Sequence, residues 1–208
     1  MTDAPPAAFD DGLGDLEPAD GPWSLEQAPA ERMFMSFGPL RLPAYGRMHA
    51  RLEFDAKTRR MGAVSVHIAD CEAQIQVIAA PRGHGLWTDM RRSITAKVKK
   101  QPGFQQTLEG RFGPELFATV TGRDREGMLR DTTVRYVGID GDRWVLRAVV
   151  TGPSVTEDAT IARVDAFLSQ CAVDRGDQPI PTGTVLELSP PAGAPVRSDA
   201  AAPDLEAP

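Results

Sequence analysis

The sequence has few of the features that mark the common classes of protein. Its 208 residues include only two cysteines, Cys71 and Cys171, with no CxxC motif and no Cys/His cluster. Neither a disulfide framework nor a zinc module is indicated, and we expect both thiols to be reduced and buried. No run approaches the roughly 18 apolar residues that a membrane span requires, and the first residues do not resemble a secretory signal. We therefore expect a cytoplasmic protein without membrane contact.

Motifs for phosphate binding and for hydrolysis are also missing. No GxGxxG follows a strand, and neither GxxxxGK[ST] nor GxSxG occurs. The three histidines, His49, His67 and His84, are not spaced as HxH or HxxxH, so no single element arranges them as metal ligands. The sequence therefore assigns no catalytic, cofactor-binding or metal-binding residue.

Charge is distributed unevenly along the chain. Lys and Arg total 23 against 29 Asp and Glu, a net charge of −6. Residues 1–31 contain eight acids and no Lys or Arg, and residues 189–208 contain Arg197 against three acids. Without these ends, residues 32–188 hold 22 basic and 18 acidic residues, a net charge of +4. Acidic ends thus enclose a mildly basic body.

The two ends also differ from the body in composition. Residues 1–31 and 189–208 are rich in Ala, Pro, Asp and Gly, and such segments bury too little apolar surface to offset chain entropy. We expect an acidic disordered N-terminal arm, in which residues 21–25 can dock through Trp23, and a disordered Pro/Ala-rich C-terminal tail. Residues 32–188 are long enough for a single domain with its own core.

Hydrophobic periodicity predicts the first half of the body. Residues 47–54 alternate apolar and polar side chains, as in a half-buried strand, and residues 64–68 and 73–79 continue this pattern. Their connections are too short for parallel crossovers, which predicts an antiparallel meander. In residues 86–100 the apolar positions change to helical spacing, which predicts an amphipathic helix with a basic outer face.

The second half repeats this order. Residues 116–120 and 132–138 have strand character, and Asp140–Gly141 predicts a type I′ turn into a return strand at 143–150. Both faces of that return strand are apolar, which favours a central position in the sheet. A helical stripe through 161–171 follows. The chain is therefore predicted to be α+β, mainly antiparallel sheet with its helices packed on one side, in a single domain.

Ordered motifs carry a resemblance to a known family. They are Gly38–Pro43, Ala80–Arg82 with Trp87, Gly113–Leu116, Val137–Arg147 closing on Gly152–Pro153, and Arg175–Asp177 with Pro179 and Pro181. With these motifs the chain resembles the uncharacterised actinobacterial DUF3710-type family, a domain of unknown function, over residues 21–188. The resemblance implies no established activity, substrate or cofactor. A weaker likeness at the level of fold, over 134–168, is to the Mog1/PsbP-like proteins, which are mostly binding and assembly factors.

Two local clusters suggest chemistry. His67, Asp70 and Cys71 raise the hypothesis of a Cys/His nucleophilic pair, but a strand followed by a turn need not bring His67 and Cys71 together. The turn from Arg82 to Trp87 opens the first helix, whose free N–H groups attract anions, so a small-anion site is a second hypothesis. The alternative is that this turn only redirects the chain while Trp87 fills the core.

Basic side chains suggest two further surfaces. The helix at 86–100 carries Arg91, Arg92, Lys97, Lys99 and Lys100, which can meet nucleic-acid phosphates or the acidic arm. A net charge of +4 is nevertheless far from the strongly basic footprint of a nucleic-acid-binding domain. Along the second hairpin, Arg135, Arg143 and Arg147 alternate and are expected to form a polar row on one sheet face. If that row is covered, the arginines must be paired.

Three functions remain as hypotheses, of which we favour the first. It is a non-enzymatic cytoplasmic protein that binds a protein partner or a second copy of itself through a sheet face or the basic helix. The second is a small-anion or small-molecule binding protein or enzyme that uses the turn from Arg82 to Trp87. The third, not favoured, is a nucleic-acid accessory factor that uses the helix at 86–100. No cofactor is expected.

Overall fold

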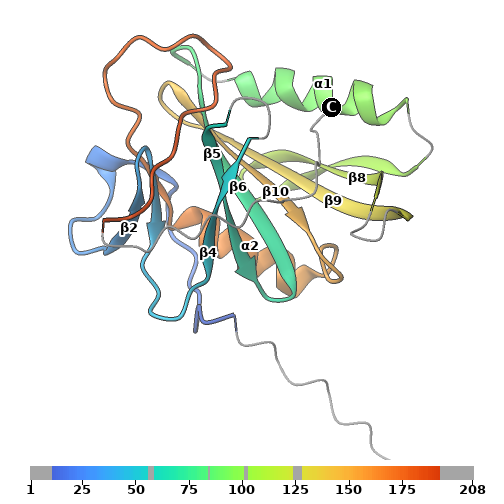
Figure 1. Cartoon of the computed structure of the whole chain (residues 1–208), viewed down its shortest axis with the longest axis horizontal. Coiled ribbons are helices and arrows are strands. Elements are labelled where there is room, and N and C mark those ends of the chain that lie inside the picture. Colours follow the sequence, from blue (N-terminus) through green and yellow to red (C-terminus); the bar gives the residue numbers. More distant parts are fainter. Residues whose placement is uncertain (1–10, 56–58, 84, 101–102, 124–127, 193–208) are drawn as a thin grey trace, which may run out of the picture.

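A seven-stranded antiparallel sheet forms the centre of the protein. The computed structural model describes residues 11–55, 59–83, 85–100, 103–123 and 128–192 (Figure 1). The strands lie in the order β4-β5-β6-β10-β9-β8-β7. Their bounds are β4 (Ala50–Phe54), β5 (Met61–Ile68), β6 (Cys71–Ala79), β7 (Gln105–Gly110), β8 (Gly113–Arg123), β9 (Leu129–Asp140) and β10 (Trp144–Thr151).

Strand β10 lies between β6 and β9, as its apolar pattern predicts. Leu146 and Ala148 face one hydrophobic cluster, and Val145 faces a second cluster on the other side of the sheet. A strand with both faces buried has to be covered on both sides. This requirement decides where the two helices pack.

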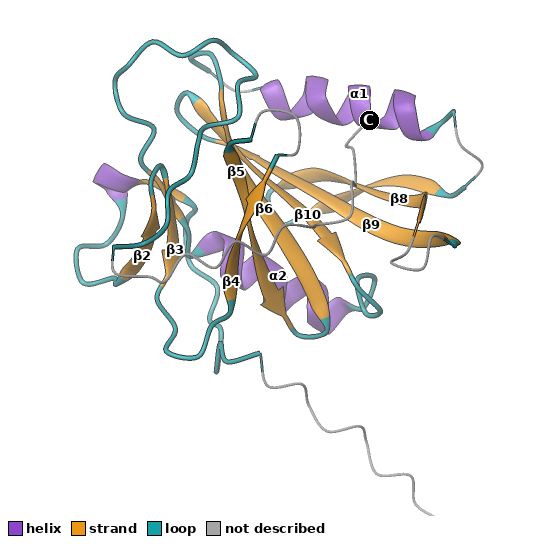
Figure 2. Cartoon of the chain, viewed as in Figure 1, coloured by secondary structure: helices purple, strands orange, loops and turns teal. Residues whose placement is uncertain are grey.

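The two helices cover opposite faces of the sheet (Figure 2). Helix α1 (Leu86–Val98) lies over β8 and β9 and buries Trp87 in the second cluster, whereas α2 (Asp158–Ser169) buries Phe167 and Leu168 in the first. The prediction of helices on one side of the sheet is therefore wrong. The α+β fold, the antiparallel sheet and the single domain are confirmed.

A small second sheet completes the fold beside α2. Its strand order is β1-β11-β3-β2, with β1 (Trp23–Ser24) followed by the 3₁₀ turn η1 (Leu25–Gln27). The other strands are β2 (Phe34–Phe37), β3 (Leu40–Pro43) and β11 (Ala172–Val173). Leu40 and Leu42 of β3 are fully buried and join the core around α2.

The arm differs from the sequence prediction from residue 11 onward. Asp11 accepts two hydrogen bonds from Arg163 of α2, at 2.7 and 2.6 Å, and Leu13 is fully buried in the core. The N–H of Ala19 donates to Ser169 Oγ at 2.9 Å. The arm therefore packs along α2, not across the basic face of α1. Most of the remaining predicted disorder falls in residues 1–10 and 193–208, which lie outside the described residues; residues 189–192 of the predicted tail are described.

The end of the described chain returns to the sheet. The N–H of Leu186 donates to Val77 O at 2.8 Å, and that of Leu188 donates to Met61 O at 2.7 Å. Residues 184–188 thus lie between the end of β6 and the start of β5. Within the described residues, no helix has the length and apolar character needed to cross a membrane.

Candidate binding site

Two tryptophan rings lie flat on the backbone of the β9–β10 hairpin. A Cβ on Gly138 would lie 2.1 Å from Cδ2 of Trp87, and a Cβ on Gly141 would lie 2.1 Å from Cε2 of Trp144. Ordinary contacts are longer than 3.4 Å, so neither position has room for a side chain. Both rings therefore pack directly against the backbone of the hairpin.

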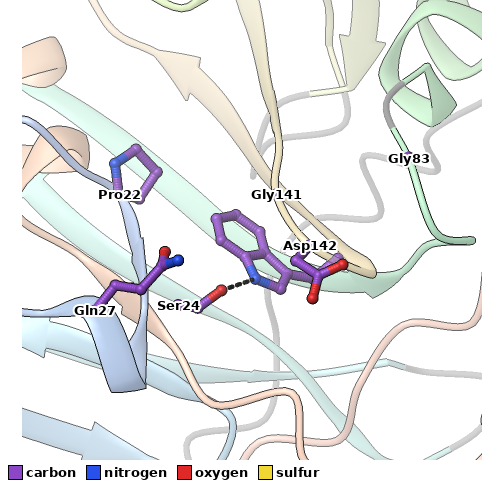
Figure 3. A pocket seen from close by; sticks show the side chains of 7 residues that line it. Pro22, Ser24, Gln27, Gly83, Gly141 and Asp142 are labelled. Carbon is purple, nitrogen blue, oxygen red and sulfur yellow. Dashed lines mark hydrogen bonds between the residues drawn. The ribbon is translucent and has the colours of Figure 1, made fainter.

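Each ring also ties the hairpin to a distant segment. Trp87 Nε1 donates to the carbonyl of Pro114 at 2.7 Å, and Trp144 Nε1 donates to Ser24 Oγ at 3.2 Å. The second bond is drawn in Figure 3. Both indole N–H groups are satisfied inside the protein, and Trp87 and Trp144 are only 4% and 2% exposed, so the rings contribute little surface to a ligand, and that surface is apolar.

The hairpin turn differs from the predicted type I′ geometry. Asp140 pairs with Val145, and the positive φ, +61°, belongs to Arg143. The N–H of Gly141 donates to Trp144 O at 2.8 Å. Gly141 is required because Trp144 packs against it, not because of a left-handed backbone.

Asp140, at the end of β9, caps α1. Its Oδ1 accepts from the N–H of Trp87 at 3.1 Å, and its Oδ2 accepts from the N–H of Gly85 at 3.2 Å. A carboxylate at a helix N-terminus satisfies free donors and interacts favourably with the helix dipole. These N–H groups are therefore not free for an external anion, contrary to the hypothesis for the turn from Arg82 to Trp87. His84, within that turn, lies outside the described residues.

Two adjacent cavities open where this hairpin meets the N-terminal segment. The first, about 320 Å³, is lined by Pro22, Ser24, Gln27, Gly83, Gly141, Asp142 and Trp144. The second, about 390 Å³, is lined by Asp20, Gly21, Pro22, Trp87, Thr88, Phe112, Pro114, Gly138, Ile139 and Asp140. Because Pro22 lines both, we call the pair the Pro22 groove. In Figure 3, Pro22 and Gln27 lie on one side of the first cavity and Asp142 on the other.

The charged groups that line the Pro22 groove are all carboxylates. Asp20 and Asp142 are exposed, and Asp140 is engaged by α1. No Lys or Arg is among the lining residues. With Pro22 and the small exposed parts of Trp87 and Trp144 in its walls and carboxylates at the rim, the groove fits a side chain that has an apolar stem and a cationic head.

A family model described as "Protein of unknown function (DUF3710)" matches residues 21–196. The chain belongs to this family. The resemblance predicted from the spaced motifs is confirmed, whereas the likeness to the Mog1/PsbP-like proteins stays a prediction. Neither the curated proteins nor the solved structures contain a match to the chain. The DUF3710 match contains every lining residue of the Pro22 groove except Asp20.

The three arginines predicted to form a row do not lie together in this DUF3710 protein. Arg147 pairs in register with Gly138, which places it on the α1 side, whereas Arg135 lies on the α2 side. Arg143 lies in the hairpin turn, 3.4 Å from Asp177. Because the antiparallel register fixes the face of each residue, no common row exists.

Arg135 is the centre of a buried ionic cluster. It is 1% exposed, its Nε donates to Glu115 at 2.8 Å, and its terminal nitrogen donates to Asp165 of α2 at 2.7 Å. Burial raises the pKa of both carboxyl groups, while Arg135 opposes that shift. The cluster joins α2 to the sheet. The sequence predicts that a covered arginine is paired. It does not identify Glu115 and Asp165 as the partners of Arg135, because no spacing in the sequence relates their segments to β9.

The predicted nucleophilic pair is not assembled. Cys71 pairs in register with Ile68 and shares its face, so His67 on the adjacent position of β5 faces the other side of the sheet. Cys71 is fully buried, and burial raises the pKa of its thiol. Its nearest polar partner is Asp70 Oδ1, at 3.6 Å, which in turn accepts a hydrogen bond from Ser154. These contacts connect the β5–β6 turn to Ser154, which lies in the segment that leads into α2.

The cations of α1 are divided between structural contacts and solvent. Arg91 donates to Thr107 Oγ1 on β7 at 3.2 Å, and Arg92 lies 3.6 Å from Asp89 on its own helix. Three exposed cations remain at the end of the helix and just after it, namely Lys97, Lys99 and Lys100. Arg82 is exposed beside the Pro22 groove without lining it, whereas Trp87 forms part of its wall.

Proposed function

We propose that this DUF3710 protein acts by binding a protein partner in the cytoplasm, not by catalysis, and that the partner docks in the Pro22 groove. The carrying observation is the pair of adjacent cavities, which have aromatic and proline walls and free carboxylates at the rim. Each volume is near the lower limit of small-molecule sites, about 300 Å³. Two such cavities in succession suit neighbouring side chains of one extended peptide better than a single enclosed ligand.

The charges of the groove indicate which peptide fits. Asp20 and Asp142 are exposed carboxylates from two different segments, and Pro22, Trp87 and Trp144 add a small apolar surface to the groove that both carboxylates line. A Lys or Arg side chain can lay its methylenes on such surface while its head reaches a carboxylate. The partner segment is therefore an extended one that carries at least one basic residue.

Two other observations support a binding role. The most reactive side chain that the sequence offers, the thiol of Cys71, is sealed in the core with a raised pKa, which disfavours a thiolate nucleophile. Both cysteines are free thiols, which agrees with a reducing compartment such as the cytoplasm.

The test is affinity capture with charge-reversed variants of the full chain. Asp142→Lys reverses a carboxylate of the groove, and Glu31→Lys makes the same change at an exposed position outside it. We expect a partner that wild type and Glu31→Lys both retain from a lysate of the producing organism, and that Asp142→Lys loses. Retention should survive nuclease treatment.

Two outcomes would contradict this proposal. Equal capture by Asp142→Lys and wild type would remove the groove from the interaction. A complex that nuclease destroys, and that Lys97→Glu weakens while Asp142→Lys does not, would favour a nucleic-acid partner at α1 instead. In either case circular dichroism of each variant separates loss of binding from loss of fold.

A further inference from the structure

The seven-stranded sheet ends on one side in a strand with an open edge. Strand β7 pairs with β8, and among the described residues no segment pairs with its outer edge. Residues 106–109, at the centre of this strand, are all exposed. The backbone N–H and C=O groups of an open edge are a template for a strand of another chain. Strand β7 is therefore a place where the sheet can be extended.

The opposite edge of the sheet, β4, carries features that hinder such pairing. Its register on β5 shifts between Glu53 and Phe54. Arg51 is bound by Glu53 at 2.8 Å and by Glu72 at 3.2 Å. Irregular register and charged side chains are devices by which proteins protect an edge strand. In contrast, β7 keeps a regular register over its six residues, and Glu109 is its one charged side chain.

The register of β7 on β8 shows which backbone groups face outward. The C=O of Phe104 accepts from the N–H of Thr119 at 2.7 Å, and bonding directions alternate along a strand. Even positions of β7 therefore bond to β8, whereas the backbone groups of Gln105, Thr107 and Glu109 point away from the sheet. When two β7 strands pair antiparallel about Thr107, Gln105 of each meets Glu109 of the other, and about six hydrogen bonds form.

The α1 side of this strand pair brings opposite charges together. Arg91 of α1 donates to Thr107 Oγ1 at 3.2 Å, and Glu109 is exposed without an ion pair to a described residue. About the axis at Thr107, Glu109 of one copy is a diagonal neighbour of Thr107 of the other, about 7–8 Å away, which long side chains can span. Arg91 of each copy therefore meets Glu109 of the second copy, and the two-fold axis repeats the pair.

The α2 side of the strand pair supplies apolar contact. Leu108 pairs in register with Glu115, which places it on this side, and it is 40% exposed. About the same axis the two Leu108 side chains are diagonal neighbours. Helix α1 leaves room for the second copy because it packs over β8 and β9. In the joined sheet the two β8 strands are about 14 Å apart, which exceeds the separation of packed helices, about 8–10 Å.

We propose that two copies of this protein associate through β7, antiparallel about a two-fold axis at Thr107, so that their sheets join into one. An open edge also accepts a strand of an unrelated protein. A second copy fits better because each copy brings both Arg91 and Glu109, which the symmetry places opposite each other. No residue of β7 lines the Pro22 groove, so this association does not depend on the proposed function.

Sedimentation velocity of the full chain over a series of concentrations tests this proposal. We expect wild type to show an equilibrium between monomer and dimer. Thr107→Pro removes the central outward N–H and leaves the bonds to β8 in place, since proline is tolerated at such edge positions. This variant should be monomeric, whereas Thr107→Val, which keeps the N–H but lacks the hydroxyl, should still dimerise. Circular dichroism shows whether each variant is folded.

Charge reversal tests the contact between the copies at Arg91 and Glu109. Arg91→Glu and Glu109→Arg each place like charges across the axis, so each variant alone should dimerise at least about tenfold more weakly than wild type. An equimolar mixture of the two variants should recover the dimer, because each copy then offers the charge that the other needs. An ion pair within one chain would gain nothing from mixing, and this test remains informative even if Thr107→Pro disturbs the fold.

Three outcomes would overturn the proposal. They are a wild type that stays monomeric at every concentration, a dimer that survives Thr107→Pro, and a mixture of the charge variants that associates no more than its components do. Asp142→Lys, which alters the Pro22 groove, should dimerise as wild type does. Loss of the dimer in that variant would place the contact at the groove and would also contradict a β7 interface.

Discussion

Substitution of Gly138 by alanine tests the packing of Trp87 against the hairpin, on which α1 and the Pro22 groove both depend. The new Cβ would lie 2.1 Å from Cδ2 and 2.2 Å from Cε3 of Trp87, so the ring has to move by more than 1 Å to reach an ordinary contact above 3.4 Å. Overpacking of this kind costs about 1–3 kcal/mol. Movement of the ring also strains the 2.7 Å hydrogen bond to Pro114, worth about 1 kcal/mol. We expect Gly138→Ala to lower the free energy of unfolding by about 2–4 kcal/mol.

Urea titration followed by circular dichroism measures this loss. Gly46→Ala is the matched control, because Gly46 has open space around it and an ordinary φ, and we expect a change within about 0.5 kcal/mol. In a Trp87→Leu background Gly138→Ala should cost less, since the smaller side chain leaves room for the methyl group. Equal unfolding midpoints for Gly138→Ala and wild type, or strict additivity with Trp87→Leu, would refute the reasoning.

Two predictions concern the ionic contacts of α2. Arg135→Ala should lower the free energy of unfolding by about 3–5 kcal/mol, because Glu115 and Asp165 would keep buried charges without a partner; a loss under about 1 kcal/mol in urea titration would contradict this. Burial acts to raise the pKa of Asp11, but its bonds from Arg163 and two backbone N–H groups outweigh burial and hold the pKa below 3.8. Such a group stabilises the fold above its unfolded-state pKa and loses this contribution as pH falls through the folded-state pKa. The loss of stability caused by Asp11→Asn should therefore be largest at neutral pH and become smaller below pH 3.8. A difference in thermal unfolding between the variant and wild type that does not depend on pH would contradict a role for the Arg163 contact.

Patterns of neighbouring residues were sufficient to predict much of the sheet. The alternation in β10 predicts a strand with two apolar faces, and the structure places it between β6 and β9. Two apolar faces on β10 already imply that both sides of the sheet are covered. The prediction of helices on one side of the sheet left this implication out. A short strand such as β1 could not be predicted, because two residues carry no period and depend on their partners.

The faces of Arg135 and Arg147 could also have been deduced. In an antiparallel hairpin, directly paired residues share a face, and in both the predicted and the observed turn an odd position on one strand pairs with an even position on the other. Arg135 and Arg147 are both odd and therefore face opposite sides. Their partners could not be deduced, because Glu115 and Asp165 reach Arg135 from a neighbouring strand and from a helix that begins only at Asp158.

The packing of residues 11–20 against α2 could not be predicted from the sequence, for a similar reason. Leu13 and Leu16 are the only large apolar residues among the Ala, Pro, Asp, Glu and Gly of residues 11–20, a composition that predicts disorder. Leu13 is buried next to Asp11, which accepts hydrogen bonds from Arg163 and from the N–H of Leu13 itself. Contacts with residues about 150 positions away, among them this bidentate pair and the hydrogen bond from Ala19 to Ser169, thus order a segment whose composition is unfavourable for order.

Two kinds of residue line the Pro22 groove, so its function can be tested separately from the stability of the fold. Gly138 and Trp87 line it but also hold α1 on the sheet, and Asp140 caps that helix. Substitutions there alter the fold and the groove together, so their effect on a partner would not identify a contact. Asp20 and Asp142 are exposed, and no structural contact of the described chain depends on them. Only residues of this second kind can show that the groove binds, because the walls remain in place when their charge is reversed.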